Sequence, residues 1–170
     1  MDDDADGILD CWKDVLANGD YNLDSGDDFG PRVLNGENDQ HNGIDIQATR
    51  GTTIYSPIRG QVIDTAQSTS QHTNNGAHVR ARVTASGTIY EFVMIHMVTD
   101  SVIVESGDSI TPGQPIGEVN CTGACGGDHL HLQVYEVTYP INPITNKPMQ
   151  KKVAIDPVPL AGGEACSKKG

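Results

Sequence analysis

The stretch "CGGDHLHLQVYE", residues 125–136, places two histidines one residue apart at the start of a run that predicts a β-strand. Side chains alternate between the two faces of a strand, so His129 and His131 share one face. Two imidazoles on one face are a natural clamp for a metal ion, and the alternative is a pair of partly exposed histidines on an edge strand. Further ligands elsewhere in the chain would favour the metal.

The rest of the chain predicts a mainly β protein. Its 19 glycines and 9 prolines separate short runs of Val, Ile, Thr and Tyr, which is typical of strands joined by turns. From Pro31 onward we expect strands near residues 32–34, 44–46, 53–56, 60–66, 77–84, 88–96, 102–104, 114–119 and 129–137. Alternation places His96 on the same strand face as Phe92 and Met94. The tail after Pro140 shows no clear element.

The first 28 residues differ from the rest in charge. They hold ten aspartates and one lysine, a net charge of −9, so residues 29–170 carry only −3 of the total of −12. We therefore expect an acidic N-terminal extension over 1–28, followed by one domain over 29–170. A short amphipathic helix is predicted over 8–16, because four apolar residues recur there at helical spacing. These residues are Ile8, Trp12, Val15 and Leu16.

Charge and composition limit the partners. An excess of acidic residues argues against nucleic acid, which needs clustered Lys and Arg. No apolar run approaches the roughly 20 residues that span a bilayer, so no membrane partner is expected. The N-terminus is acidic where a signal peptide is basic, so we expect the mature form if the protein is exported. Asp20, Asn22 and Asp24 are spaced like calcium ligands, but Pro31 stands where such a loop needs Glu, which argues against calcium.

Four cysteines allow three disulfide pairings. The simplest joins Cys121 to Cys125 around a short loop and Cys11 to Cys166 across the two ends of the chain. Disulfides would indicate an oxidising compartment, whereas free thiols are the alternative.

A second pair of candidate ligands lies in "HNGIDI", residues 41–46, where His41 precedes Asp45 by four residues. Gly43 between them lets the backbone bend so that both side chains can face one point. With one histidine of the His129–His131 pair they make a set of two nitrogens and one oxygen. Three protein ligands with an open fourth position are typical of catalytic zinc, which lowers the pKa of a bound water to about 7.

The remaining histidines divide into two groups. His96, at the end of a strand, and the second histidine of the pair are free to handle the proton of such a water. His72 lies in a polar loop, and His78 alternates with apolar strand residues, so both are predicted to be solvated.

These motifs resemble those of the LytM/lysostaphin-type zinc metalloendopeptidases, which include the β-lytic enzymes. The likeness extends beyond the H-x-x-x-D and H-x-H pairs over residues 29–160. It includes "FGPR" (29–32), "HNGIDIQATRGTTIYSPIRGQVI" (41–63), "VESGDSITPGQPIGEV" (104–119) and "DP" (156–157).

The resemblance implies a zinc metallopeptidase domain with an antiparallel β-sheet of barrel-sandwich-like type. One zinc ion per chain would be held by His41, Asp45 and His131, with His96 and His129 as the catalytic histidines. The implied substrates are stem peptides or crossbridges of bacterial peptidoglycan, or Gly-rich proteins. We expect a monomer that is secreted, either extracellular or periplasmic.

The chain also departs from the family pattern. "NCTGACGGDHLH" carries two cysteines, and it has Asp128 where proline is common. A catalytically inactive zinc-binding domain of the same fold, acting as a regulator or signalling protein, is the alternative function. A biotinyl or lipoyl carrier domain is excluded, because no lysine lies between Arg50 and Gly117.

Overall fold

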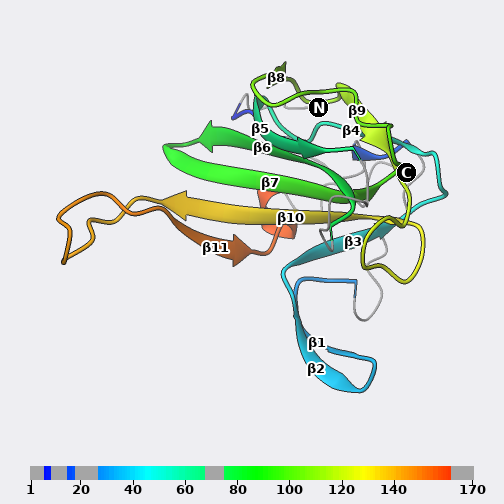
Figure 1. Cartoon of the computed structure of the whole chain (residues 1–170), viewed down its shortest axis with the longest axis horizontal. Helices are drawn as coiled ribbons and strands as arrows, with labels where there is room; N and C mark the ends of the chain where they lie inside the picture. Colours follow the sequence, from blue (N-terminus) through cyan, green and yellow to red (C-terminus); the bar gives the residue numbers. More distant parts are fainter. Residues whose placement is uncertain (1–5, 9–14, 18–26, 68–74, 162–170) are drawn as a thin grey trace.

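The computed structural model describes residues 6–8, 15–17, 27–67 and 75–161 (Figure 1). It is a mainly antiparallel β structure, which confirms the predicted fold class. The strands are β1 (Gly30–Leu34), β2 (Glu37–His41), β3 (Gly43–Gln47), β4 (Thr53–Tyr55), β5 (Gly60–Ala66), β6 (Ala77–Ala85), β7 (Thr88–Met97), β8 (Ser109–Ile110), β9 (Pro115–Glu118), β10 (His129–Thr138) and β11 (Lys151–Ile155). A short 3-10 helix, η3, spans Val158–Ala161.

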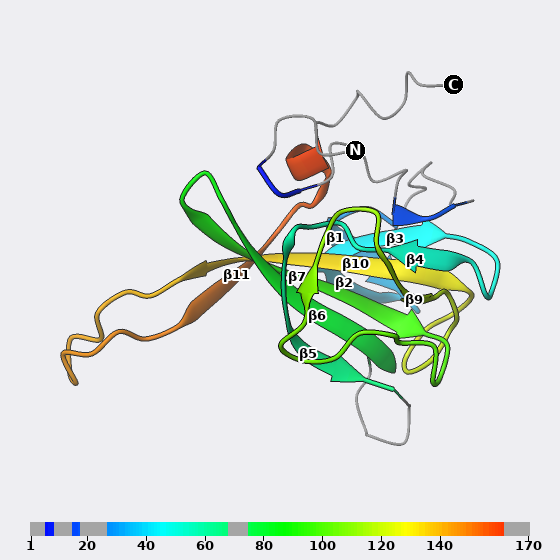
Figure 2. The same ribbon diagram turned by 90° about the horizontal axis from the view of Figure 1, so that it is seen from above.

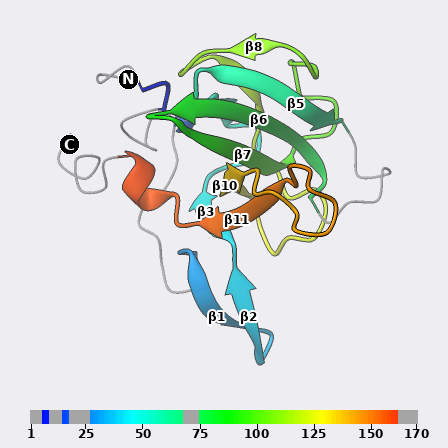
Figure 3. The ribbon, with the colours of Figure 1, turned by 90° about the vertical axis from the view of Figure 1, so that its left-hand side faces the viewer.

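A seven-stranded sheet forms the body of the molecule. Six strands follow the order β11-β10-β7-β6-β5-β8, and the seventh, β3, also pairs with β10. The same edge of β10 pairs with β3 along its first half and with β11 along its second half. A hairpin of β1 and β2 extends away from this sheet (Figures 1 and 3). The chain between β10 and β11 forms a long projecting arm, which Figure 2 shows from above.

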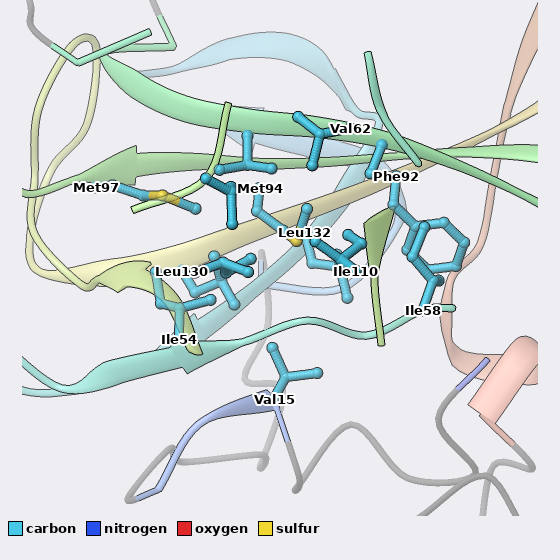
Figure 4. Close-up of a cluster of buried hydrophobic side chains, with 14 of the residues drawn as sticks. Val15, Ile54, Ile58, Val62, Phe92, Met94, Met97, Ile110, Leu130 and Leu132 are labelled. Atoms are coloured by element: carbon cyan, nitrogen blue, oxygen red, sulfur yellow. The ribbon is translucent and has the colours of Figure 1, made fainter. Parts of the chain in front are cut away.

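One face of the sheet carries the hydrophobic core. Phe92 and Met94 of β7 and Leu130 and Leu132 of β10 are fully buried and point to the same side (Figure 4). The two-stranded sheet of β4 and β9 packs against them through buried side chains such as Ile54. Buried and partly exposed residues alternate along β10, whereas β7 is buried on both sides from Glu91 to Met97. The sheet thus has one apolar face, and its other face carries polar side chains that are partly covered.

The N-terminal residues that the structure describes contribute to this core. Ile8, Val15 and Leu16 are buried in it, as their apolar pattern predicted. The predicted α-helix over 8–16 is not found at its described residues, Ile8, Val15 and Leu16. Ile8 and Leu16 form isolated antiparallel bridges with Ile58 and Ile54, and the segment between them lies outside the described residues. Backbone groups of Ile58 and Ile54 thus pair with the described residues on either side of that segment.

Some strand predictions were wrong. Residues 102–104 are not a strand, although Val102 and Val104 are buried, because this segment packs by its side chains and has no ladder partner. Three strands were missed: β2, β8 and β11. Strand β2 is polar, β8 has two residues, and β11 lies in the tail where no element was expected. Each forms because a neighbouring strand offers it hydrogen bonds, which no local pattern indicates.

In the part of the chain that the structure describes, no helix has the length and apolar character needed to cross a bilayer.

The polar face of the sheet contains a buried carboxylate. Glu91 of β7 is fully buried, and its oxygens accept hydrogen bonds from Arg82 at 3.0 Å and from Lys152 at 2.7 Å. Arg80 lies 3.5 Å away. Strands β6, β7 and β11 are thereby linked through one side chain. Removing the charge of such a carboxylate destabilises the fold, because its cationic partners are then left without a counter-charge.

We therefore predict that Glu91→Gln lowers the free energy of unfolding by about 3 kcal/mol, because three cations lose their counter-charge. Chemical denaturation measures this change. The exposed Glu105 provides the matched control, since Glu105→Gln should change stability by less than about 0.5 kcal/mol. Equal effects of the two substitutions would contradict the assigned role of Glu91.

Candidate active site

Three strands bring the predicted metal ligands together. His41 is the last residue of β2, Asp45 lies in β3, and His131 lies directly opposite Asp45 in the β3–β10 pair. His131 Nδ1 is 2.7 Å from Asp45 Oδ1 and 3.1 Å from His41 Nε2, and His41 Nε2 is 3.3 Å from Asp45 Oδ1. One donor atom from each residue therefore faces a common point, as a metal site requires.

The backbone fixes which nitrogen of His41 faces this point. Its Nδ1–H donates to the carbonyl of Asp28 at 2.8 Å, so Nε2 carries the free lone pair. The ring itself is only 2% exposed. Arg32 adds a cation on the far side of Asp45, with Nη1 3.6 Å from Oδ2. Arg32 thus attracts Oδ2 of the carboxylate, while Oδ1 faces the histidines.

Gly43 is required for space between the ligands. A Cβ atom at this position would lie 2.5 Å from the carbonyl oxygen of Leu132 and 2.8 Å from Nε2 of His131. Backbone bending was the expected reason for this glycine. Its missing side chain also lets β3 approach β10 closely, and that approach brings His41 and Asp45 to His131.

A bulge in β7 turns His96 towards the site. Met94 pairs with Val79 and Met97 pairs with Ala77, so β7 has one extra residue between these pairs. His96 has φ of 68°, the left-handed region that such a bulge uses. The prediction that His96 shares a face with Phe92 and Met94 is therefore wrong. The bulge puts Met97 in the core and His96 on the polar face.

His96 and His129 lie beside the ligands. Their ring centroids are 4.9 Å apart, and His129 Nε2 is 3.4 Å from Asp45 Oδ1. The Nδ1–H of His96 donates to the carbonyl of Thr122 at 2.7 Å, and that of His129 donates to the carbonyl of Gly127 at 2.8 Å. Both rings therefore keep Nε2 available on the side of the site.

The local environment keeps Asp45 charged and His96 neutral. Burial alone would raise the pKa of Asp45, but the short contacts of its carboxylate with His131 and His41 outweigh burial and hold that pKa well below its usual value. Burial lowers the pKa of His96 to about 4, against a hydrogen bond to Thr122 that raises it. At neutral pH, His96 is an uncharged imidazole that can accept a proton.

All five predicted site residues line one groove of about 1020 Å³. One wall includes Leu34 of the β1–β2 hairpin, and another is formed by the loop before β10. Amide side chains contribute much of the remaining polar lining, including Asn75, Gln47 and Gln133. Hydrogen-bonding groups of this kind suit an extended peptide backbone.

His78 does not line this groove. His72 falls outside the described residues. His78 was expected to be solvated, but it is 4% exposed. Its ring nitrogens lie 3.1 Å from the carbonyl of Gly76 and 3.2 Å from Asp64. Asp64 on the neighbouring strand β5 thus gives the buried ring of His78 a polar partner.

Sequence reasoning missed the residues that orient the site. Asp28, Thr122 and Gly127 act through backbone carbonyls, so their side chains gave no signal. Arg32 was noted only as part of "FGPR". A basic residue two strands from an acidic ligand is a weak signal until the register of the hairpin is known.

Gly43→Ala tests the close approach of β3 and β10. The new methyl group should displace His131 and weaken metal binding by about 10- to 100-fold. Titration with a competing chelator measures this affinity. Gly126→Ala is the matched control, because a Cβ there meets no atom within 4 Å, and it should leave the affinity unchanged. Unaltered metal binding in Gly43→Ala would contradict the assignment.

Known proteins resemble this chain over the same segment. The model of peptidase family M23 matches residues 39–143, which include all five site residues. An uncharacterized metalloprotease of Haemophilus influenzae is 29% identical over 107 residues, which make up 63% of this chain and 21% of that protein. Peptidoglycan DD-endopeptidase ShyA of Vibrio cholerae is 31% identical over 114 residues, 66% of this chain and 24% of that protein. The chain thus spans less than a quarter of the length of these relatives.

Solved structures share the fold. The catalytic domain of lysostaphin from Staphylococcus simulans aligns with a TM-score of 0.58 at 21% identity, covering 86% of this chain and 92% of that one. A variant of the catalytic domain of the prophage-encoded M23 protein EnpA from Enterococcus faecalis aligns with a TM-score of 0.52 at 25% identity, covering 72% of this chain and 83% of that one. The family model covers more than half of the chain, and on that basis this chain belongs to peptidase family M23.

Proposed function

We propose that this chain is a zinc-dependent endopeptidase that hydrolyses peptide bonds in peptidoglycan stem peptides or crossbridges. His41, Asp45 and His131 would hold the zinc ion, and His96 and His129 would be the catalytic residues. The observation that carries the proposal is the convergence of three donor atoms in a groove, beside two further imidazoles whose Nδ1 atoms are already bonded.

The donor set fits zinc. Two neutral imidazole nitrogens and one carboxylate oxygen are usual zinc ligands, and three of them leave one position open for catalysis. Tetrahedral ligands at zinc bond lengths lie about 3.3 Å apart. The three donor-to-donor distances here are 2.7, 3.1 and 3.3 Å, so only small shifts are needed to accept the ion.

The chemistry divides between the metal and the two histidines. Zinc, when bound, would polarise the substrate carbonyl and lower the pKa of a water molecule. Because carbonyl groups hold Nδ1–H of His96 and His129, protons enter and leave these rings at Nε2. One ring would accept the proton of the attacking water and pass it to the leaving amine. The other, protonated at Nε2, would donate a hydrogen bond to the developing oxyanion.

The substrate class rests on the relatives and on the groove. ShyA is named a peptidoglycan DD-endopeptidase, and lysostaphin is named an antimicrobial peptidase. An amide-lined groove offers donors and acceptors to a peptide backbone, including the Gly-rich chains that are the second candidate substrate. Peptidoglycan lies outside the cytoplasm, so we propose that the protein is secreted or periplasmic. We also propose that it is a monomer. The disulfide between Cys121 and Cys125 fits an oxidising compartment.

Metal removal tests the enzyme directly. The purified chain should bind about one zinc ion and release soluble fragments from peptidoglycan or cleave oligoglycine. A chelator should abolish this activity, and added zinc should restore it, because a preformed three-ligand site rebinds the ion. A chain that binds zinc yet cleaves neither substrate would instead support the non-catalytic zinc-binding domain.

Two substitutions on one strand separate the proposed roles. His131→Ala removes a ligand and should lose both zinc and activity. His129→Ala should keep zinc affinity within a few-fold while turnover falls by about 10²- to 10⁴-fold. Metal analysis and kcat are measured on the same samples. Loss of zinc from His129→Ala, or retained turnover, would contradict the division of roles.

A further inference from the structure

One loop contacts both proposed catalytic histidines. It joins β9 to β10 and covers residues 119–128 (Figure 1). Its Thr122 carbonyl accepts the Nδ1–H of His96, and its Gly127 carbonyl accepts the Nδ1–H of His129. The rings of the proposed metal ligands have different contacts, since the His41 ring donates to the carbonyl of Asp28 and the His131 ring faces Asp45. The orientation of His96 and His129 therefore depends on this loop.

Thr122 fixes the first carbonyl. Its hydroxyl donates to the carbonyl of Met97 at 2.6 Å and accepts from the backbone N–H of Ala77 at 3.1 Å. The residue is 8% exposed. These two bonds join the loop to the end of β7, next to the bulge at His96. Without the hydroxyl, Thr122 would lose these two hydrogen bonds and keep only the bond of its carbonyl to the ring of His96.

The rest of the loop has little to hold it except the disulfide. Gly123, Ala124, Gly126 and Gly127 are exposed, and a Cβ at Gly126 or Gly127 would meet no neighbour. Glycine-rich backbone of this kind has high conformational entropy. The bond from Cys121 to Cys125 closes a short ring that contains Thr122 and ends two residues before Gly127. It therefore restricts the backbone around the first carbonyl and the backbone that leads to the second.

The second end of the loop is fixed near His129. Asn120 forms an isolated bridge with His129, and Arg50 binds Asp128 at 3.1 Å. The ion pair is exposed, so it contributes little by itself. Covalent closure by the disulfide therefore adds a constraint on the backbone that leads to Gly127, beside the pairing of Asn120 with His129.

We propose that the Cys121–Cys125 disulfide and Thr122 are positioning elements that orient His96 and His129 for proton transfer, so that turnover requires the closed loop and metal binding does not. This inference rests on the proposed function. The competing explanation is a disulfide that only stabilises the fold. Such a bond would affect the unfolding temperature and leave kcat unchanged in folded protein.

The first experiment compares the wild-type chain with the double variant Cys121→Ser and Cys125→Ser, well below the unfolding temperature of both. Loss of an orienting partner typically costs about 10- to 100-fold. We expect kcat to fall by that factor, while KM and zinc affinity stay within about twofold. A chain with Cys11→Ser and Cys166→Ser keeps only the loop cysteines, so a phosphine reductant should lower its kcat reversibly. Unchanged kcat in both tests would overturn the proposal.

A second pair of variants tests Thr122. Thr122→Val keeps the shape and removes the hydroxyl, whereas Thr122→Ser keeps the hydroxyl. We expect Thr122→Val to lower kcat by about 10-fold or more with little change in KM. Thr122→Ser should retain most of the activity. Equal kcat values for the two variants, with both folded, would show that the hydroxyl does not position His96.

A spectroscopic measurement is independent of substrate. In the zinc-loaded protein, the Nδ1–H protons of His96 and His129 should exchange slowly with water and give resolved ¹H–¹⁵N signals. In the double cysteine variant both signals should weaken or vanish. If the wild-type chain cleaves no substrate, the proposed function fails, yet these signals still decide whether the loop orients the rings. Signals that persist in the variant would contradict the loop's role.

Discussion

The close pairing of β3 with β10 is the constraint on which the site depends. In this register Asp45 lies opposite His131, and the missing side chain of Gly43 lets the two strands approach. A shift by one residue would send Asp45 to the opposite face, because strand side chains alternate. The buried Ile44 and Ile46 of β3 prevent such a shift, since they would have to enter solvent. Core packing thus fixes the metal geometry.

Much of this arrangement could be predicted from the sequence. The H-x-x-x-D and H-x-H spacings identified the residues that converge in the structure, because period-2 alternation is a local property. The long strands β5, β6, β7 and β10 were predicted nearly to their ends for the same reason. The hydrophobic alternation of each strand, and the residues that form its turns, lie within one short stretch of the sequence.

The rest depends on contacts between distant segments. His96 was assigned to the core face because a bulge adds one residue and alternation cannot reveal it. The burial of His78 depends on Asp64 in another strand. Strands β2 and β11 exist because β1 and β10 have free edges for them. Thr122 and Gly127 act through carbonyl groups, which every residue has, so no sequence pattern distinguishes them.

The two kinds of histidine have supports that can change independently. Ligands on paired strands are protected by the core, because a substitution that moved them would also destabilise the sheet. A surface loop has no such protection and accepts substitutions and insertions easily. Under the proposed roles, substitutions in the loop between β9 and β10 would therefore alter or abolish catalysis while the metal site and the fold persist. A few substitutions in this loop would then suffice to convert an enzyme of this fold into a protein that only binds metal.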